Sequence, residues 1–214
     1  MIGLDDTTVW AVLRAAGIGS YLMLFLSVAG GLAATTAPFG RRVAKASAAA
    51  LHQAAGAVGL GLLAVHLGGL LLDRVVGFEL LDLVVPFRAR YRPAALALGI
   101  LAMDAAVVVT AASYLRRRIG TSGWRATHLL AVPAFTAALL HGLLAGTDTV
   151  RPAMWWTYVA TGAAVVFLLL VRGLAPRPEA RRPVREAPRS APDAAPPRRG
   201  SRPTTLPVAV TRTP

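Results

Sequence analysis

The sequence contains no cysteine among its 214 residues. This absence excludes disulfides, Cys-ligated iron–sulfur clusters and a thiolate ligand to haem iron, so His, Met or oxygen ligands would have to hold any metal. Charge is scarce as well: 15% of the residues are charged, 55% are hydrophobic, and mean hydropathy is +0.56. This composition is typical of a membrane protein and argues against a soluble globular fold.

Acidic residues are rare, with 10 Asp and Glu against 23 Lys and Arg and a net charge of +13. In a soluble protein this excess would suggest nucleic-acid binding. Here the arginines cluster between apolar runs and after residue 172. This distribution favours arginines that contact anionic lipids and orient the chain in the membrane, and we expect no nucleic-acid partner. No Ser-His-Asp arrangement, zinc-ligand spacing or phosphate loop is present, so we expect no hydrolytic or covalent chemistry.

Five apolar stretches are each long enough to cross roughly 30 Å of hydrocarbon at about 1.5 Å per residue. They predict an all-α membrane protein, a bundle of five transmembrane helices that crosses the plasma membrane several times. The predicted spans cover residues 12–36, 48–72, 94–115, 127–146 and 153–174.

Basic residues set the predicted orientation. Arg41, Arg42 and Lys45 follow the first span, and the sequence RRRIGTSGWR follows the third. The positive-inside rule then puts the N-terminus outside and the C-terminus in the cytoplasm. The loop at 73–93 would lie outside, with its apolar centre as a short interfacial helix.

The chain divides into three predicted segments. Residues 1–11 form a short external N-terminus without the positive charge of a signal peptide, so we expect the first helix to be retained. Residues 12–175 form the transmembrane domain. Residues 176–214 hold ten of the fifteen prolines and predict a disordered Pro/Arg-rich cytoplasmic tail, more simply a solvated extension than a site that docks a partner.

The four histidines of the chain fall on two predicted spans. His52 and His66 lie 14 residues apart on the second span, and His128 and His141 lie 13 apart on the fourth. Each pair is therefore separated by roughly 20 Å along its helix. Because one span intervenes, the second and fourth spans run in the same direction. His52 and His128 then share an inner level, and His66 and His141 an outer level.

Histidines at membrane depth are costly and are functional candidates by default, although a single one is more often a satisfied interior side chain. A haem iron with two axial imidazoles needs one histidine from each side of the ring, and a helix pair supplies them at one depth. The four histidines therefore predict two haem b groups with iron ligands His52, His66, His128 and His141.

The helical phase of the two pairs differs. At about 100° per residue, 14 residues return to within roughly 40° of the starting face, whereas 13 residues miss it by roughly 140°. Pro133 lies between His128 and His141, and a proline kink would recover part of this difference. Small residues surround the histidines and predict either a porphyrin against the backbone or close helix packing. They are Ala54, Ala55, Gly56, Gly59, Gly61, Gly68, Gly69 and Gly142.

The sequence SYLRRRIGTSGWRATH at 113–128, the sequence HGLLAGTD at 141–148 and the histidine spacing together resemble the ferric reductase-like transmembrane domain family, over residues 10–175. This family includes the membrane parts of ferric reductases and NADPH oxidases, and the haem-binding membrane subunit of bacterial methionine sulfoxide reductase systems. The resemblance is strongest to the bacterial branch. It implies two b-type haems that carry electrons across the membrane one at a time.

The resemblance also implies cofactor-binding arginines. Arg14 matches an arginine beside the outer haem, where it would contact a propionate, although an arginine snorkelling to the interface is an equal alternative. Arg125 and Arg42 at the inner level and Arg151 at the outer level are further propionate candidates by depth. The larger family members carry domains that bind FAD and NAD(P)H. We do not expect this chain to bind either cofactor. A separate cytoplasmic flavoprotein reductase or a membrane quinol would then be the electron donor, and an external redox protein, ferric iron or oxygen the acceptor.

Two further residues invite a role. Asp104 lies in the middle of the third span, where it could serve a proton path or a haem, or be satisfied by a neighbouring side chain. Phe135 lies midway between His128 and His141 and could separate the haems, or simply pack. The leading hypothesis is an oxidoreductase component that conducts electrons across the membrane. The alternatives are a quinone-linked cytochrome b subunit and a non-redox membrane scaffold.

Overall fold

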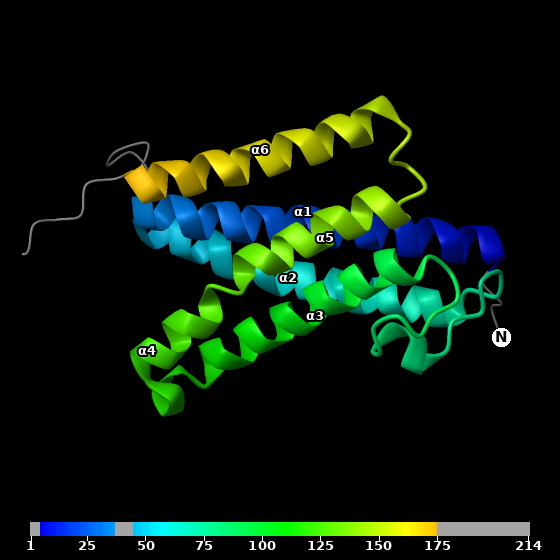
Figure 1. Ribbon diagram of the computed structural model, residues 1–214, viewed down its shortest axis with the longest axis horizontal. Coiled ribbons are helices and arrows are strands. Elements are labelled where there is room, and N and C mark those ends of the chain that lie inside the picture. The colour runs from blue at the N-terminus through cyan, green and yellow to red at the C-terminus, as the bar shows by residue number, and fades with distance from the viewer. Residues whose placement is uncertain (1–4, 37–44, 175–214) are drawn as a thin grey trace, which may run out of the picture. The chain divides into compact units, whose positions relative to one another are not determined.

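The computed structural model describes residues 5–36 and 45–174 (Figure 1). Throughout these two ranges all regular structure is helical and no strand occurs. The predicted tail at 176–214, residues 1–4, Arg41 and Arg42 lie outside the described residues. The elements are α1 (Asp6–Thr36), α2 (Lys45–Leu72), the short 3-10 helix η2 (Leu80–Leu83), α3 (Pro93–Tyr114), α4 (Arg116–His128), α5 (Ala131–Ala145) and α6 (Pro152–Leu174).

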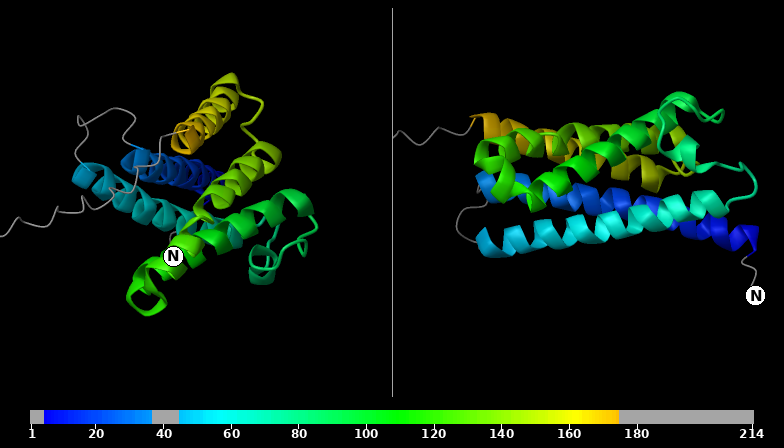
Figure 2. Two further views of the ribbon diagram at one scale, coloured as in Figure 1. Left: turned by 60° about the vertical axis from the view of Figure 1, so that its left-hand side comes forward. Right: turned by 90° about the horizontal axis from the view of Figure 1, so that it is seen from below.

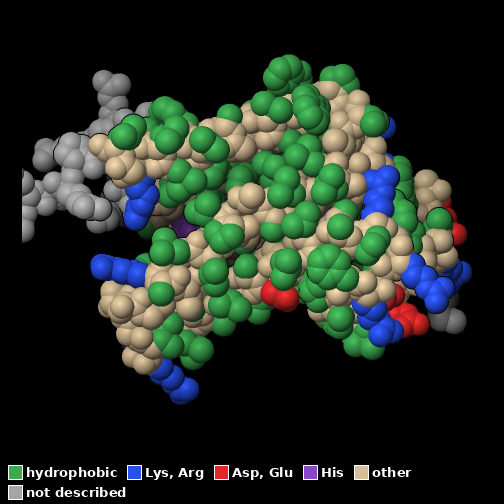
Figure 3. Space-filling view, viewed as in Figure 1, with side chains coloured by type: hydrophobic (Ala, Val, Ile, Leu, Met, Phe, Trp, Pro, Cys, Tyr) green, Lys and Arg blue, Asp and Glu red, His purple; other side chains and the backbone are tan. Residues whose placement is uncertain are grey.

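Four of these helices, α1, α2, α3 and α6, are long and apolar enough to cross a membrane. The predicted fourth span, 127–146, corresponds mainly to α5, while the basic segment before it, predicted as a loop, forms α4, whose backbone departs from helical geometry at Gly120. Helices α4 and α5 meet at a bend of 41° and together satisfy the same criteria. The large side chains on the surface are mostly hydrophobic (Figure 3), as lipid contact requires. The described part of the chain is therefore all-helical and suited to a membrane.

Helix α1 begins six residues before the predicted start of the first span. The Asp5 side chain accepts a hydrogen bond of 3.0 Å from the backbone N–H of Thr8 and so caps the first turn. Hydrogen bonding by Thr8, through its side chain and its backbone, lowers the pKa of the Asp5 carboxyl. Residues 6–11, which were predicted to belong to a short external N-terminus at 1–11, are therefore part of α1.

The break between α4 and α5 lies at Leu129 and Leu130, ahead of Pro133. A proline ring clashes with the carbonyl four residues earlier, which here belongs to Leu129, and the proline has no N–H to donate to it. The Leu130 N–H bonds to the Thr127 carbonyl at 3.1 Å, a tighter three-residue turn at this point. The predicted proline effect therefore occurs, as a break that separates His128 from His141 into two helices.

Most of the contacts between helices fall within two pairs. Helix α1 makes its most extensive contacts with α2, and α3 makes its own with α5, while α6 lies against α1 (Figure 2). Buried aromatic and β-branched side chains from α1, α5 and α6 form a core where these helices meet. The members of that core are Tyr21, Val28, Phe135, Tyr158 and Val165.

The connection between α2 and α3 is an ordered loop. Its predicted interfacial helix is only the four-residue helix η2, and Arg88 forms ion pairs of 3.2 Å with both Glu79 and Asp82 around it. The Arg92 guanidinium donates to the Leu144 carbonyl at 2.5 Å, which ties the start of α3 to the end of α5. The loop is thus held in place beside the start of α3 and the end of α5.

Candidate functional site

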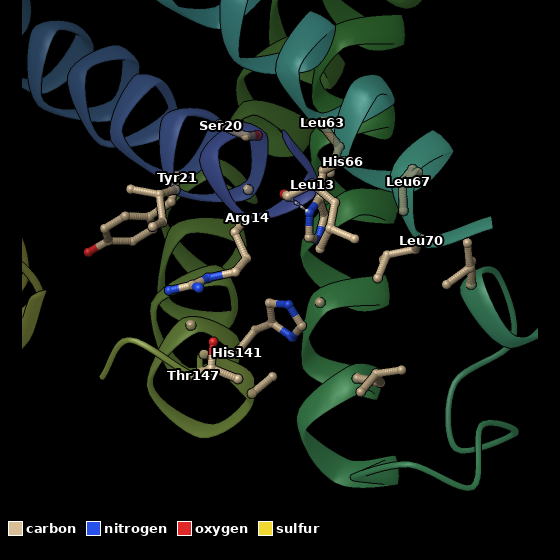
Figure 4. Close-up of a pocket in the computed structure, with 18 of the residues that line it drawn as sticks. Leu13, Arg14, Ser20, Tyr21, Leu63, His66, Leu67, Leu70, His141 and Thr147 are labelled. Atoms are coloured by element: carbon tan, nitrogen blue, oxygen red, sulfur yellow. Dashed lines mark hydrogen bonds between the residues drawn. The ribbon is translucent and has the colours of Figure 1, made fainter. Parts of the chain in front are cut away.

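The four histidines come together as two pairs, each with one member on α2. The rings of His52 and His128 have centroids 5.8 Å apart and an interplanar angle of 73°. His66 and His141 line one cavity, which they enter from α2 and α5 (Figure 4). These are the pairs that the sequence spacing assigns to common levels.

The cavity lined by His66 and His141, which we call the outer cavity after the level predicted for these histidines, has a volume of about 610 Å³, within the range of 300–1,000 Å³ that is typical of small-molecule and cofactor sites. Its walls come from α1, α2, α3, α5, the connection after α5 and the loop between α2 and α3, with Tyr158 contributed by α6. Figure 4 shows His66 and His141 approaching each other across it, with Arg14 at the side. Phe78 and Tyr91 of the loop between α2 and α3 also line it.

Three of the imidazoles are anchored to the backbone of the preceding long helix. Nδ1 of His66 donates to the Leu13 carbonyl at 2.7 Å, and Nδ1 of His141 donates to the Ala95 carbonyl at 2.8 Å. Nδ1 of His52 lies 2.8 Å from the Ser27 carbonyl oxygen. A carbonyl can only accept, so these contacts put a proton on Nδ1, and in a neutral imidazole the free lone pair is then on Nε2. This tautomer is the one that an imidazole needs to bind a metal through Nε2.

A glycine stands four residues after each accepting carbonyl. A Cβ on Gly17 would lie 2.9 Å from His66 Nδ1, and one on Gly99 would lie 2.8 Å from His141 Nδ1. The same position on α1 near His52 is Gly31, where a Cβ would lie 3.3 Å from Nδ1. Because glycine has no side chain at these positions, the imidazole rings can reach the backbone carbonyls.

Sequence reasoning missed these three glycines. The small residues considered from the sequence were instead those beside the histidines on α2. Most of those that have a close neighbour pack against α1: Gly59 faces Met23 and Gly69 faces Leu13. A signal was nevertheless available, because Gly17 and Gly31 are 14 residues apart, as His52 and His66 are.

His128 is held differently from the other three. Its Nδ1 is buried and has no hydrogen-bond partner among the described residues. Its ring stacks on Trp124, one turn earlier on α4, with centroids 5.1 Å apart and an interplanar angle of 30°. The Arg116 guanidinium lies over the Trp124 ring, 4.3 Å from its centre. Aromatic packing thus orients the His128 ring in place of a backbone carbonyl.

Arg14 lines the outer cavity, where it forms an ion pair with Asp148 and lies 3.8 Å over the Trp10 ring. Its side chain is 20% exposed and that of Asp148 is 14% exposed, so this is a largely buried pair rather than an arginine reaching for the interface. Asp148 also forms an ion pair of 3.1 Å with Arg151, and the Arg151 side chain is 74% exposed. Arg125 is exposed on α4.

Within residues 5–36 and 45–174, no three His, Cys, Asp or Glu side chains gather as a metal cluster. A haem requires fewer protein ligands, since the porphyrin supplies the other bonds to iron and two axial imidazoles suffice. Two pairs of imidazoles, three of them anchored through Nδ1, and a largely apolar cavity between His66 and His141 fit such a group.

Phe135 is 2% exposed and stacks on Tyr21, with ring centroids 5.9 Å apart, and it also contacts Phe25. It belongs to the core among α1, α5 and α6, as the packing alternative expects. Asp104 is exposed on α3 and does not line the outer cavity.

Comparison of the chain with protein-family models, curated proteins and solved structures found no match. The geometry of the histidines therefore carries the functional argument.

Proposed function

We propose that this protein conducts electrons across a cell membrane through two b-type haems, one held by His52 and His128 and the other by His66 and His141. In this proposal α4 and α5 form one broken span, so that the chain crosses the membrane five times with its N-terminus outside. Electrons would pass from a cytoplasmic flavoprotein reductase or a membrane quinol to an external redox acceptor. Such a role would make the chain an oxidoreductase component similar to ferric reductase-like membrane domains.

The observation that carries the proposal is the anchoring of three paired imidazoles through Nδ1. A histidine that served only packing would need no fixed tautomer, whereas an iron ligand does. The carbonyl anchors leave the Nε2 atoms of His52, His66 and His141 available as bases. His52 lies beside His128, and His66 shares a cavity with His141, so each pair can supply two axial ligands.

When bound, the haem iron would supply one-electron redox chemistry without protons or covalent intermediates on the protein. The tasks of the chain itself are positional. The backbone carbonyls of α1 and α3 orient the imidazoles, and the apolar wall of the outer cavity excludes water. Arg14 offers a cation beside His66 and His141, already neutralised by Asp148.

Optical spectroscopy of the purified protein tests the proposal. We expect reduced-minus-oxidised spectra of low-spin haem with two axial imidazoles, at about two haems per chain. His66→Ala and His141→Ala should remove one haem, and His52→Ala and His128→Ala the other. Gln53→Ala, at an exposed neighbour of His52, is the matched control and should retain both.

Three outcomes would contradict the proposal: protein purified without haem, loss of the same haem from His52→Ala and His66→Ala, or haem retained in all four variants. The donor is then identified by mixing the oxidised protein with a reduced flavoprotein or with a quinol. Rapid reduction by quinol alone would favour a quinone-linked cytochrome over a conduit fed from the cytoplasm.

A further inference from the structure

Asp104 lies near the midpoint of α3, and its side chain is exposed. It has no hydrogen bond or ion pair with any residue that the structure describes. In the middle of a bilayer, an ionisable side chain that faces lipid costs several kcal/mol, and such residues almost always face a protein neighbour or a water-filled cavity. An isolated chain in lipid would therefore be poorly satisfied at this position.

The residues around Asp104 form a continuous exposed stripe. At about 100° per residue, Leu101 and Val107 lie about 60° to either side of Asp104, Val108 about 40° away and Ala111 about 20° away. All four are exposed. Asp104 thus occupies the centre of the outward face of α3, which we call the Asp104 face: Leu101, Asp104, Val107, Val108 and Ala111.

The Asp104 face is separate from the candidate haem sites. Gly99 and Met103 of α3 line the outer cavity, and a Cβ on Gly99 would meet the His141 ring, whereas no residue of the Asp104 face lines that cavity. The predicted roles of Asp104 beside a haem or as a side chain satisfied by a neighbour in the same chain therefore find no support in the described residues. The partner that Asp104 requires therefore lies outside the described residues.

We propose that the Asp104 face is the contact between two copies of this chain, in which the two Asp104 carboxyls hydrogen-bond to each other across a twofold axis. Copies inserted in the same orientation are related by an axis along the membrane normal, so identical residues meet at identical depth. A foreign helix would have to present a donor at this depth by design, whereas a second copy does so by symmetry.

The chemistry of the carboxyl favours this self-pairing. A protonated carboxyl carries one O–H donor and free acceptor capacity, so two such groups satisfy each other, and two carboxyls that share one proton do so as well. The flanking residues of the Asp104 face are apolar and of modest size, and they can pack against their own copies. The interface needs no cation, and the arginines of α4 and of the outer loop lie towards the helix ends.

Cysteine cross-linking tests this contact directly, because the chain contains no native cysteine. Val108→Cys introduces a thiol on the Asp104 face. Val166→Cys is the matched control: it is also a valine, about 14 residues from the outer end of α6, and it is 56% exposed against 45% for Val108. After mild oxidation of the full chain in lipid nanodiscs or native membranes, we expect a disulfide-linked dimer for Val108→Cys and monomer for Val166→Cys.

A second pair of variants isolates the carboxyl. In the Val108→Cys background, Asp104→Asn should keep the dimer, since an amide also donates and accepts. Asp104→Leu should weaken association about three- to tenfold, the range measured for single hydrogen bonds between membrane helices. Because the readout is the mass of the cross-linked species, it does not depend on haem content. Gel filtration of both variants checks that they remain folded.

Any one of four results would overturn the proposal. They are equal cross-linking at Val108→Cys and Val166→Cys, a monomeric mass for the unmodified protein in nanodiscs at all concentrations, dimer of undiminished strength in Asp104→Leu, and cross-linking of Val108→Cys to a different membrane protein. The last result would assign the Asp104 face to a foreign partner.

Discussion

At His66, His141 and His52, three small features act together: a ring N–H, a backbone carbonyl, and a glycine four residues further along the same helix as the carbonyl. In a regular helix that carbonyl already accepts from the N–H of the glycine residue. A Cβ there would crowd the second donor, the imidazole. Glycine therefore leaves the carbonyl open to two donors, at the usual helix cost of up to about 1 kcal/mol relative to alanine.

Gly99→Ala tests this arrangement. Its Cβ would lie 2.8 Å from His141 Nδ1, closer than packed atoms allow, so the ring must move away from the Ala95 carbonyl. We expect overpacking of about 1–3 kcal/mol and loss of the outer haem, with the inner haem retained. Haem content and thermal unfolding measure the two effects. Gly61→Ala, which has open space at its Cβ, should keep both haems and leave stability equal or higher.

Trp124 takes the place of a carbonyl anchor for His128. Its replacement by alanine removes a stacking contact worth about 0.5–1.5 kcal/mol and frees the His128 ring. Trp124→Ala should therefore lower the occupancy of the inner haem or shift its midpoint potential, while the outer haem stays unchanged. Trp124→Phe should restore most of the loss. A redox titration that found both haems shifted equally would show that Trp124 acts on the whole bundle instead.

At the scale of elements, the break between α4 and α5 decides where His128 points. Pro133→Ala restores the N–H and removes the clash with the Leu129 carbonyl, which should straighten the span. A continuous helix would turn His128 about 140° away from the face of His141. We expect loss of the inner haem with the outer haem retained, measured by haem stoichiometry. Pro152→Ala, at the start of α6, is the control and should retain both.

This element also marks the limit of what sequence could predict. The need for a distortion followed from the 13-residue spacing and Pro133, but a proline kink can take many bend angles, and packing selects among them. The apolar runs predicted the helices, because lipid requires every backbone group to be satisfied within a helix. The role of Gly17, Gly31 and Gly99 could not be predicted, because it exists only where another helix brings a histidine against them.

The ion pair between Arg14 of α1 and Asp148 of the α5–α6 connection joins two elements across the outer cavity. Asp148→Asn leaves a largely buried guanidinium without its counter-charge and should destabilise the protein by about 3 kcal/mol. Arg151→Ala removes only an exposed partner of Asp148 and should change stability by less than about 1 kcal/mol. Thermal unfolding of both variants in the same detergent makes the comparison. Equal effects would mean that Arg14 contributes nothing beyond a surface pair.

At the scale of the whole molecule, one structural unit occurs twice. In the first, α1 supplies the carbonyls and glycines that orient the histidines of α2, and in the second, α3 does the same for His141 of α5. One candidate haem site lies between α2 and α5, at His66 and His141, and the other between α2 and α4, at His52 and His128. The repetition is incomplete at His128, where a stack of Trp124 and Arg116 replaces the carbonyl.

If electrons pass through the two haems in series, removal of one haem should stop electron transfer across the membrane while the other haem stays bound. His52→Ala should retain the outer haem, yet a donor on the cytoplasmic side should reduce that haem at least about tenfold more slowly than in the unaltered protein. A membrane-impermeant reductant added on the outer side should still reduce it at the normal rate, because His66 and His141 remain in place. Stopped-flow spectroscopy of oriented proteoliposomes separates the two rates. Unchanged reduction from the cytoplasmic side would mean that electrons bypass the His52 and His128 level.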